Sequence, residues 1–145
     1  MTDGNRPSTA GRGWLLAGSV LLLLTATAHT MGQFGPTPPP LEAAVVAMQA
    51  ARLDMGLGMV PSLVDILQDL SFTMSVTFYG LGALNLLLAR SSDVTPRLRR
   101  QVALVNLGWL TAFTAIGAIY RIPPPLICGV IMWPVFLMVY VRSRT

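Results

Sequence analysis

Four long apolar stretches, separated by short polar or proline-rich segments, dominate the pattern of the chain. They cover residues 13–31, 62–89, 101–120 and 124–142. Each approaches the length of about 20 mostly apolar residues that an α-helix needs to cross the hydrocarbon core of a bilayer. Only helices and closed barrels satisfy their backbone groups in lipid. The pattern therefore predicts an all-α, up-and-down bundle of four transmembrane helices.

The connection formed by residues 32–61 is the only long one. It begins as "GQFGPTPPP", whose prolines exclude a regular helix. It continues as "LEAAVVAMQAARL", in which Leu41, Val45 and Met48 fall on one helical face. We expect a short amphipathic helix here, lying in the outer membrane interface or over the outer end of the bundle.

The arginines indicate the orientation of this bundle. Eight of them fall on the side of the amino terminus and two on the opposite side. The larger group is Arg6, Arg12, Arg90, Arg97, Arg99, Arg100, Arg142 and Arg144, and the smaller is Arg52 and Arg121. Because basic residues in short loops stay inside, we expect a multi-pass protein of the cell (cytoplasmic, inner) membrane with both termini cytoplasmic. Residues 1–12 would be a cytoplasmic tail, 13–145 a single membrane domain and 32–61 the external loop.

The first apolar stretch has an alternative interpretation as a signal peptide. Arg6 and Arg12 precede it, and Ala26 and Ala28 have the spacing of a cleavage site. Cleavage of residues 1–28 would leave three spans. We favour a retained helix, because the apolar region continues to Met31 without turn residues before the site.

Composition supports a membrane protein. Of 145 residues, 53% are hydrophobic and 11% charged, whereas soluble domains have about 25% charged residues. The net charge of +4 comes from arginines between apolar runs, so it indicates topology and no nucleic-acid partner. Cys128 is the single cysteine, which excludes a disulfide within the chain and a paired-cysteine site. No catalytic motif is found, and we predict no catalytic, cofactor or metal residues.

The segment "TPRLRR" predicts the start of the third helix. Thr95 suits the N-cap and Pro96 the first helical position. Its three arginines oppose the helix dipole, so we expect anionic lipid to stabilise them, with a cytoplasmic partner as the alternative. Farther along, Asn85 and Asn106 are expected to bond across the bundle.

The second apolar stretch contains two aspartates. Ser62 and Asp65 have the spacing of a capping box, which would start the helix. Asp69 lies one turn deeper, on an i+4 row with Asp65, Thr73 and Thr77. An aspartate facing lipid costs about 2.5 to 3.5 kcal/mol at mid-depth. We therefore expect this polar row to face the interior of the bundle.

The predicted topology brings further polar residues to the outer level of Asp69. The candidate polar cluster consists of His29, Asp65, Gln68, Asp69 and Arg121. In one interpretation Asp69 pairs with Arg121 or His29 to tie helices together. In the other the cluster is an outward-facing site for a proton, cation or polar ligand. Methionines near His29 would suit copper(I), but they are better explained as packing residues.

The pattern as a whole resembles a family of small four-span bacterial integral membrane proteins, known as a domain of unknown function. The matching segments are "AHTMG", "AAVVAMQAARLDM", "SLVDILQDLSF", "GLGALNLLLAR" and "YRIPPP", within residues 14–140. The resemblance implies that Asp65 belongs to the family pattern. Glycine is common in the family at the position of Asp69, which is therefore particular to this chain. The resemblance implies no activity or cofactor.

These observations favour an accessory or structural membrane protein that acts through helix packing or a partner, either another membrane protein or a second copy of the chain. The alternative is a small transporter or a ligand-binding or ion-binding membrane protein that uses the outer cluster. A membrane enzyme is the third and weakest hypothesis, since no residues are predicted to carry a reaction.

Overall fold

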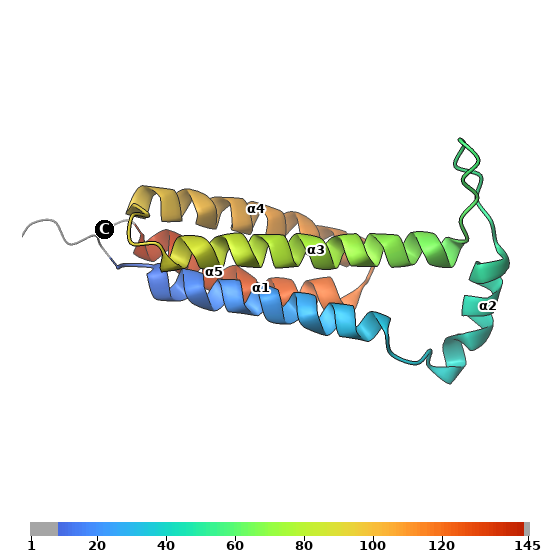
Figure 1. The fold of residues 1–145 in the computed structure, drawn as a ribbon. Helices are drawn as coiled ribbons and strands as arrows, with labels where there is room; N and C mark the ends of the chain where they lie inside the picture. The colour runs from blue at the N-terminus through green and yellow to red at the C-terminus, as the bar shows by residue number, and fades with distance from the viewer. Residues whose placement is uncertain (1–8, 144–145) are drawn as a thin grey trace, which may run out of the picture. The chain divides into compact units, whose positions relative to one another are not determined.

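The structure, a computed structural model, describes residues 9–143, and the helices in this range are shown in Figure 1. They are α1 (Arg12–Gln33), the 3-10 helix η1 (Pro39–Leu41), α2 (Glu42–Ala50), α3 (Leu63–Arg90), α4 (Pro96–Ile119) and α5 (Pro123–Arg142). Helices α1, α3, α4 and α5 are long and apolar enough to cross a membrane. The predicted all-α class with four spans is confirmed. Residues 1–8 of the predicted tail, with Arg6, and also Arg144 lie outside the described residues.

The chain divides into two units, and each is described by itself. The helical unit contains the described residues up to Thr25 and those from Gly80 onward. It therefore holds the first part of α1, the last part of α3, and all of α4 and α5. The loop unit is Ala26–Tyr79, which holds the end of α1, η1, α2 and the first part of α3.

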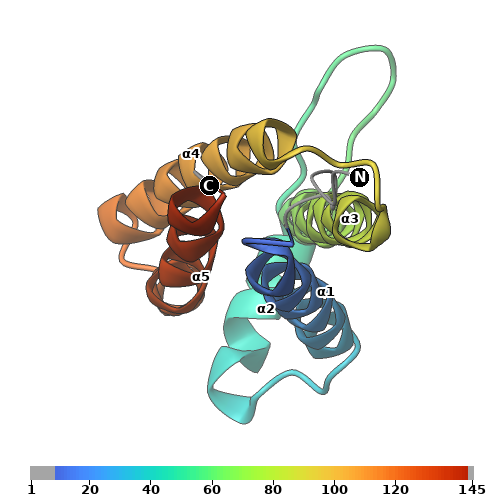
Figure 2. The same cartoon turned by 90° about the vertical axis from the view of Figure 1, so that its left-hand side faces the viewer.

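Close helix contacts build the helical unit. Helices α4 and α5 lie side by side (Figure 2). A Cβ atom on Gly129 of α5 would lie 2.1 Å from Oγ1 of Thr114 on α4, and one on Gly18 of α1 would lie 2.7 Å from the ring of Phe136 on α5. Only glycine allows such an approach, so these two positions set the spacing of α5 from its neighbours.

Two arginines at the start of α4 bind groups of the protein itself. Arg99 is only 3% exposed, and its guanidinium donates to the carbonyl oxygens of Ala10 at 2.6 Å and Val94 at 2.9 Å. Arg100 donates to the hydroxyl of Tyr140 and lies 4.4 Å above the centre of its ring. The expectation that lipid stabilises all three arginines is therefore wrong for buried Arg99, whereas half-buried Arg100 has a partner within the chain. Exposed Arg97 remains available to lipid.

Two helix caps lie at the same end of the helical unit as Arg99. Arg12 donates to the carbonyl oxygens of Ala89 at 2.7 Å and Arg90 at 3.2 Å, at the carboxyl end of α3. A cation there also complements the negative end of the helix dipole. The Thr95 hydroxyl accepts the backbone N–H of Leu98 at 3.2 Å, which confirms the predicted N-cap.

In the loop unit, two contacts fix α1 against α3. The Tyr79 hydroxyl donates to Oγ1 of Thr27 at 3.0 Å. The ring of Phe34, which directly follows α1 and comes seven residues after Thr27, meets that of Phe72 on α3, seven residues before Tyr79, with centroids 5.9 Å apart. These segments therefore run antiparallel in constant register.

The predicted amphipathic helix corresponds to α2, which lies between these segments in the chain. Val45 and Met48 of its predicted apolar face are half-buried, and the remaining residues of α2 are exposed. The predicted face is confirmed for Val45 and Met48 and is wrong for Leu41, which lies in η1 and is 52% exposed.

Candidate functional site

The first carboxylate of α3 is used to start the helix. Oδ2 of Asp65 accepts the backbone N–H of Ser62 at 2.8 Å and its hydroxyl at 2.7 Å, while the Ser62 hydroxyl oxygen accepts the N–H of Asp65 at 3.1 Å. This confirms the predicted capping box. Arg52 Nη1 lies 3.9 Å from Asp65 Oδ2, but both side chains are more than half exposed. Such a surface ion pair contributes at most about 1 kcal/mol.

The polar row of α3 faces outward. Asp65, Asp69, Thr73 and Thr77 are all exposed, so the expectation that they face the interior of the bundle is wrong. The buried positions along this part of α3 are Ser75, Phe78, Gly82, Asn85 and Ala89. At about 100° per residue, these two rows lie on opposite sides of the helix. The row of Ser75, Phe78, Gly82, Asn85 and Ala89 is therefore the side of α3 that packs against other helices, and the polar row is on the exposed side.

The predicted outer cluster is not assembled within one unit. His29, Asp65, Gln68 and Asp69 belong to the loop unit, and Arg121 belongs to the helical unit. Asp69 and Gln68 are exposed, and Asp69 has no hydrogen bond or ion pair within Ala26–Tyr79. Arg121 is an exposed residue of the α4–α5 turn with φ of 56°. The hypothesis that Asp69 pairs with His29 is wrong for this structure.

A different polar group is found inside the loop unit. Nε2 of His29, Oγ1 of Thr30 and Oγ of Ser75 are buried, and no group among the described residues is their hydrogen-bond partner. All three lie between the Thr27–Tyr79 and Phe34–Phe72 contacts that join α1 to α3. A buried polar group without a partner costs about 1–3 kcal/mol. Each of these atoms would therefore be stabilised by a hydrogen bond with a polar molecule.

Sequence reasoning singled out only His29 from this group. Ser75 is 3% exposed and shares its helical phase with Phe78 and Gly82, the buried row of α3. That phase was the available signal for Ser75. It was missed because the i+4 row of Asp69 and Thr73 has the more conspicuous polar pattern.

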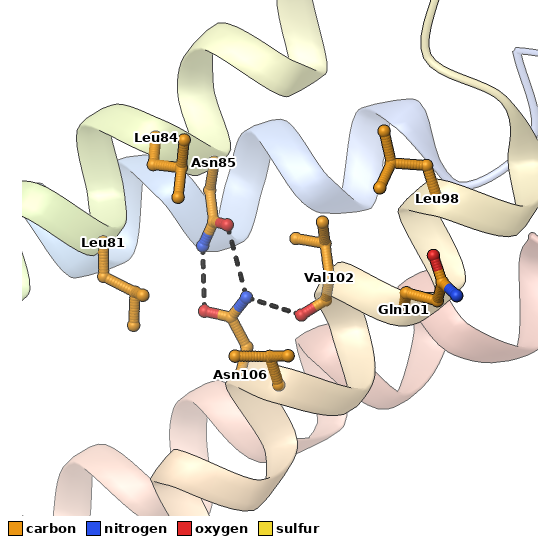
Figure 3. A pocket seen from close by; sticks show the side chains of 8 residues that line it. Leu81, Leu84, Asn85, Leu98, Gln101, Val102 and Asn106 are labelled. Carbon is orange, nitrogen blue, oxygen red and sulfur yellow. Dashed lines mark hydrogen bonds between the residues drawn. The ribbon is translucent and has the colours of Figure 1, made fainter.

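Deeper in the helical unit, Asn85 of α3 and Asn106 of α4 form a reciprocal amide pair (Figure 3). Asn85 Nδ2 donates to Asn106 Oδ1 at 2.8 Å, and Asn106 Nδ2 donates to Asn85 Oδ1 at 3.2 Å and to the carbonyl of Val102 at 2.8 Å. Each asparagine is 1% exposed. The predicted bond across the bundle is confirmed, and it ties α3 to α4.

A cavity of about 240 Å³ adjoins this pair. Its lining consists of Leu81, Leu84, Asn85, Leu98, Gln101, Val102, Val105 and Asn106. Apolar side chains dominate the wall, and no ionisable group lines it. Within residues 9–143, no three His, Cys, Asp or Glu side chains are close enough to hold a metal ion together. This cavity suits apolar chains better than a reacting polar substrate.

Comparison of the chain with protein-family models, curated proteins and solved structures finds no match.

Proposed function

We propose that this integral membrane protein is an accessory or structural subunit that associates laterally with another membrane protein through the outer half of α3. The observation that carries the proposal is Asp69, an exposed carboxylate without a partner in its unit, on the side of α3 opposite its buried row. We also propose that the protein lies in a bacterial inner membrane with both termini cytoplasmic. We propose further that it belongs to the four-span family that it resembles.

The depth of the polar row supports a protein partner. At about 1.5 Å per residue, Asp69 lies about 31 Å along α3 from Arg90, close to the thickness of the hydrocarbon core, which is about 30 Å. Thr73 then lies inside the hydrocarbon region, and its exposed hydroxyl has no partner among the described residues. Polar side chains on lipid-exposed helices gain about 0.6–2 kcal/mol from bonds to another helix.

Space for a partner helix is present on the same face. Gly80 continues the row of Thr73 and Thr77, and a Cβ atom placed on it would meet nothing within 4 Å. Small residues on a membrane helix allow another helix backbone to approach closely. The row therefore combines an unpaired acid, a hydroxyl and room for close contact.

Charge favours a particular kind of partner. Two copies that joined their α3 helices in parallel would place two Asp69 carboxylates together, which is unfavourable. A helix with an arginine, a lysine or another hydrogen-bond donor near the membrane edge would instead complement Asp69. We therefore favour a different membrane protein over a symmetric pair of this chain.

The substitution Gly80→Leu is expected to raise the dissociation constant of the complex about tenfold, which corresponds to a loss of about 1.4 kcal/mol of binding free energy. A Cβ atom at position 80 meets nothing within 4 Å, so the added side chain should obstruct a partner helix and leave the packing of its own chain intact. The measurement is native electrophoresis of membranes solubilised in mild detergent, after cross-linking in intact cells.

Gly108→Leu is the matched control, because a Cβ atom on Gly108 of α4 also meets nothing within 4 Å. It should leave the complex unchanged. The proposal fails if the wild-type chain migrates as a monomer, or if Gly80→Leu and Asp69→Leu both leave the complex intact. Mass analysis of the cross-linked product distinguishes a second copy from another protein.

We propose as a second candidate a membrane protein that binds a small polar ligand or ion. The observation that favours it is the buried group of His29, Thr30 and Ser75. Hydroxyl and imidazole groups can both donate and accept hydrogen bonds, so a small neutral or ionic polar molecule fits them. Residues of this kind inside a membrane span are functional candidates.

Cysteine at Ser75 tests this candidate in a chain with Cys128→Ala. A binding site must exchange with water, so Ser75→Cys should react with a small hydrophilic thiosulfonate several times faster than Val76→Cys. Val76 is the neighbouring residue, 69% exposed on the outer surface of α3, where lipid would keep its thiol unreactive. A faster reaction at Val76→Cys would rule the site out.

A further inference from the structure

A backbone hairpin with one isolated β-bridge, between Arg52 and Ser62, projects from the amino end of α3. Its two arms are joined by bonds from the N–H of Leu63 to the carbonyl of Ala51 at 3.1 Å, Leu53 to Pro61 at 3.0 Å, and Met55 to Met59 at 3.0 Å. Both views show the hairpin extending to the side of α3 (Figures 1 and 2). The hairpin of residues 51–63 is therefore an ordered element and not an irregular loop.

The tip of the hairpin holds a leucine in an unfavourable backbone conformation. Gly56, Leu57 and Gly58 have φ of 79°, 53° and 77°, all in the left-handed region. That region costs about 1–2 kcal/mol for an ordinary L-residue, whereas glycine adopts it freely. Leu57 is nevertheless 97% exposed, so burial within its own chain does not offset this cost. No part of residues 9–143 covers the side chain of Leu57.

The rest of the hairpin surface is also apolar. Four further large side chains on it are about half exposed, namely Leu53, Met55, Met59 and Val60. Its charged residues are Arg52, which contacts Asp65, and Asp54, whose Oδ1 accepts the N–H of Gly56 at 2.8 Å. Residues 55–60 carry no charge, and the exposed Asp54 carboxylate is held against the backbone of the turn by its bond from Gly56.

We propose that the hairpin inserts Leu57 into the lipid leaflet at the amino end of α3. The exposed apolar surface of α3 continues into the hairpin, since the backbone N–H of exposed Leu63 is bonded to Ala51 at the base of the hairpin. Measured as for Asp69, from Arg90 at the edge of the hydrocarbon core, Leu63 lies about 40 Å along α3, which at the common helix tilt of about 20° is about 8 Å outside the far edge of the core, in the headgroup layer. A sideways hairpin at this level lies in the interface, where apolar side chains enter about 5–10 Å.

The test uses the full chain with Cys128→Ala, reconstituted into phosphatidylcholine vesicles. A nitrobenzoxadiazole fluorophore is attached at Leu57→Cys, and at Thr37→Cys as an exposed control in the same loop. Brominated acyl chains should quench the fluorophore at position 57 at least threefold more than at position 37. Equal quenching at both positions would overturn the proposal.

A second measurement guards against distortion of the tip by the label. With the fluorophore at Met59→Cys, Leu57→Asn should reduce quenching by brominated lipid at least twofold, because asparagine fits the left-handed backbone but does not favour lipid. Unchanged quenching at position 59 would contradict insertion through Leu57. A fluorophore at position 57 that is shielded in native membranes and water-exposed in lipid vesicles would assign the tip to a protein partner and overturn lipid insertion.

Discussion

Replacement of Arg99 by methionine is expected to lower the free energy of unfolding by about 3 kcal/mol, since hydrogen bonds from a charged donor contribute about 1.5–3 kcal/mol each. The guanidinium is nearly completely buried and donates to the carbonyls of Ala10 and Val94. Methionine retains much of the apolar stem but leaves both oxygens without their charged donor. Ala10 precedes α1, so this loss also releases the start of α1 from the start of α4.

The measurement is unfolding in detergent micelles, followed by far-ultraviolet circular dichroism. Arg97→Met is the matched control, because Arg97 is exposed in the same turn of α4 and has no partner among the described residues. Its effect should remain within about 0.5 kcal/mol, as is usual for a surface substitution. Equal destabilisation by the two substitutions would show that helix charge, and not the bonds of Arg99, accounts for the effect.

The start of α4 shows why hydropathy alone misplaces the end of a helix. The apolar pattern places the third span at 101–120, whereas α4 is Pro96–Ile119. The capping signal of Thr95 and Pro96 marks the true start, because a cap depends on local backbone bonds and not on hydropathy. The buried role of Arg99 was not predictable, since its acceptor Ala10 is 89 residues away in the chain.

The orientation of α3 was the larger error of prediction. Periodicity identified the row of Asp69 and Thr73 correctly, but it does not determine which row faces the rest of the chain. Gly82 decides this, because a Cβ atom there would lie 2.9 Å from Leu23 of α1. The side of α3 that admits the closest neighbour is the side that packs, and the assumption that one chain must bury its own polar row was wrong.

Leucine at Asn85 is expected to lower the free energy of unfolding by about 2 kcal/mol, because a buried polar group without its partner costs about 1–3 kcal/mol. In Asn85→Leu, Asn106 keeps its bond to Val102, but its Oδ1 loses its donor. The double variant Asn85→Leu, Asn106→Leu removes both amides. Its loss should be below about 1 kcal/mol, since replacing both partners by apolar groups is nearly neutral.

A double-mutant cycle measures the coupling between the two amides. It compares the unfolding, in the same detergent, of the wild-type chain, Asn85→Leu, Asn106→Leu and the double variant. Gln101→Leu is the control, because Gln101 lines the same cavity but is exposed and has no partner among residues 9–143. It should change stability by less than about 0.5 kcal/mol. If the double variant instead loses the sum of the two single losses, the amides act independently, and apolar packing alone holds α3 against α4 at this depth. With single losses of about 2 kcal/mol each and a double loss of about 1 kcal/mol, the coupling should be about 3 kcal/mol, which would show that the two amides stabilise the packing of α3 on α4 as one bonded pair.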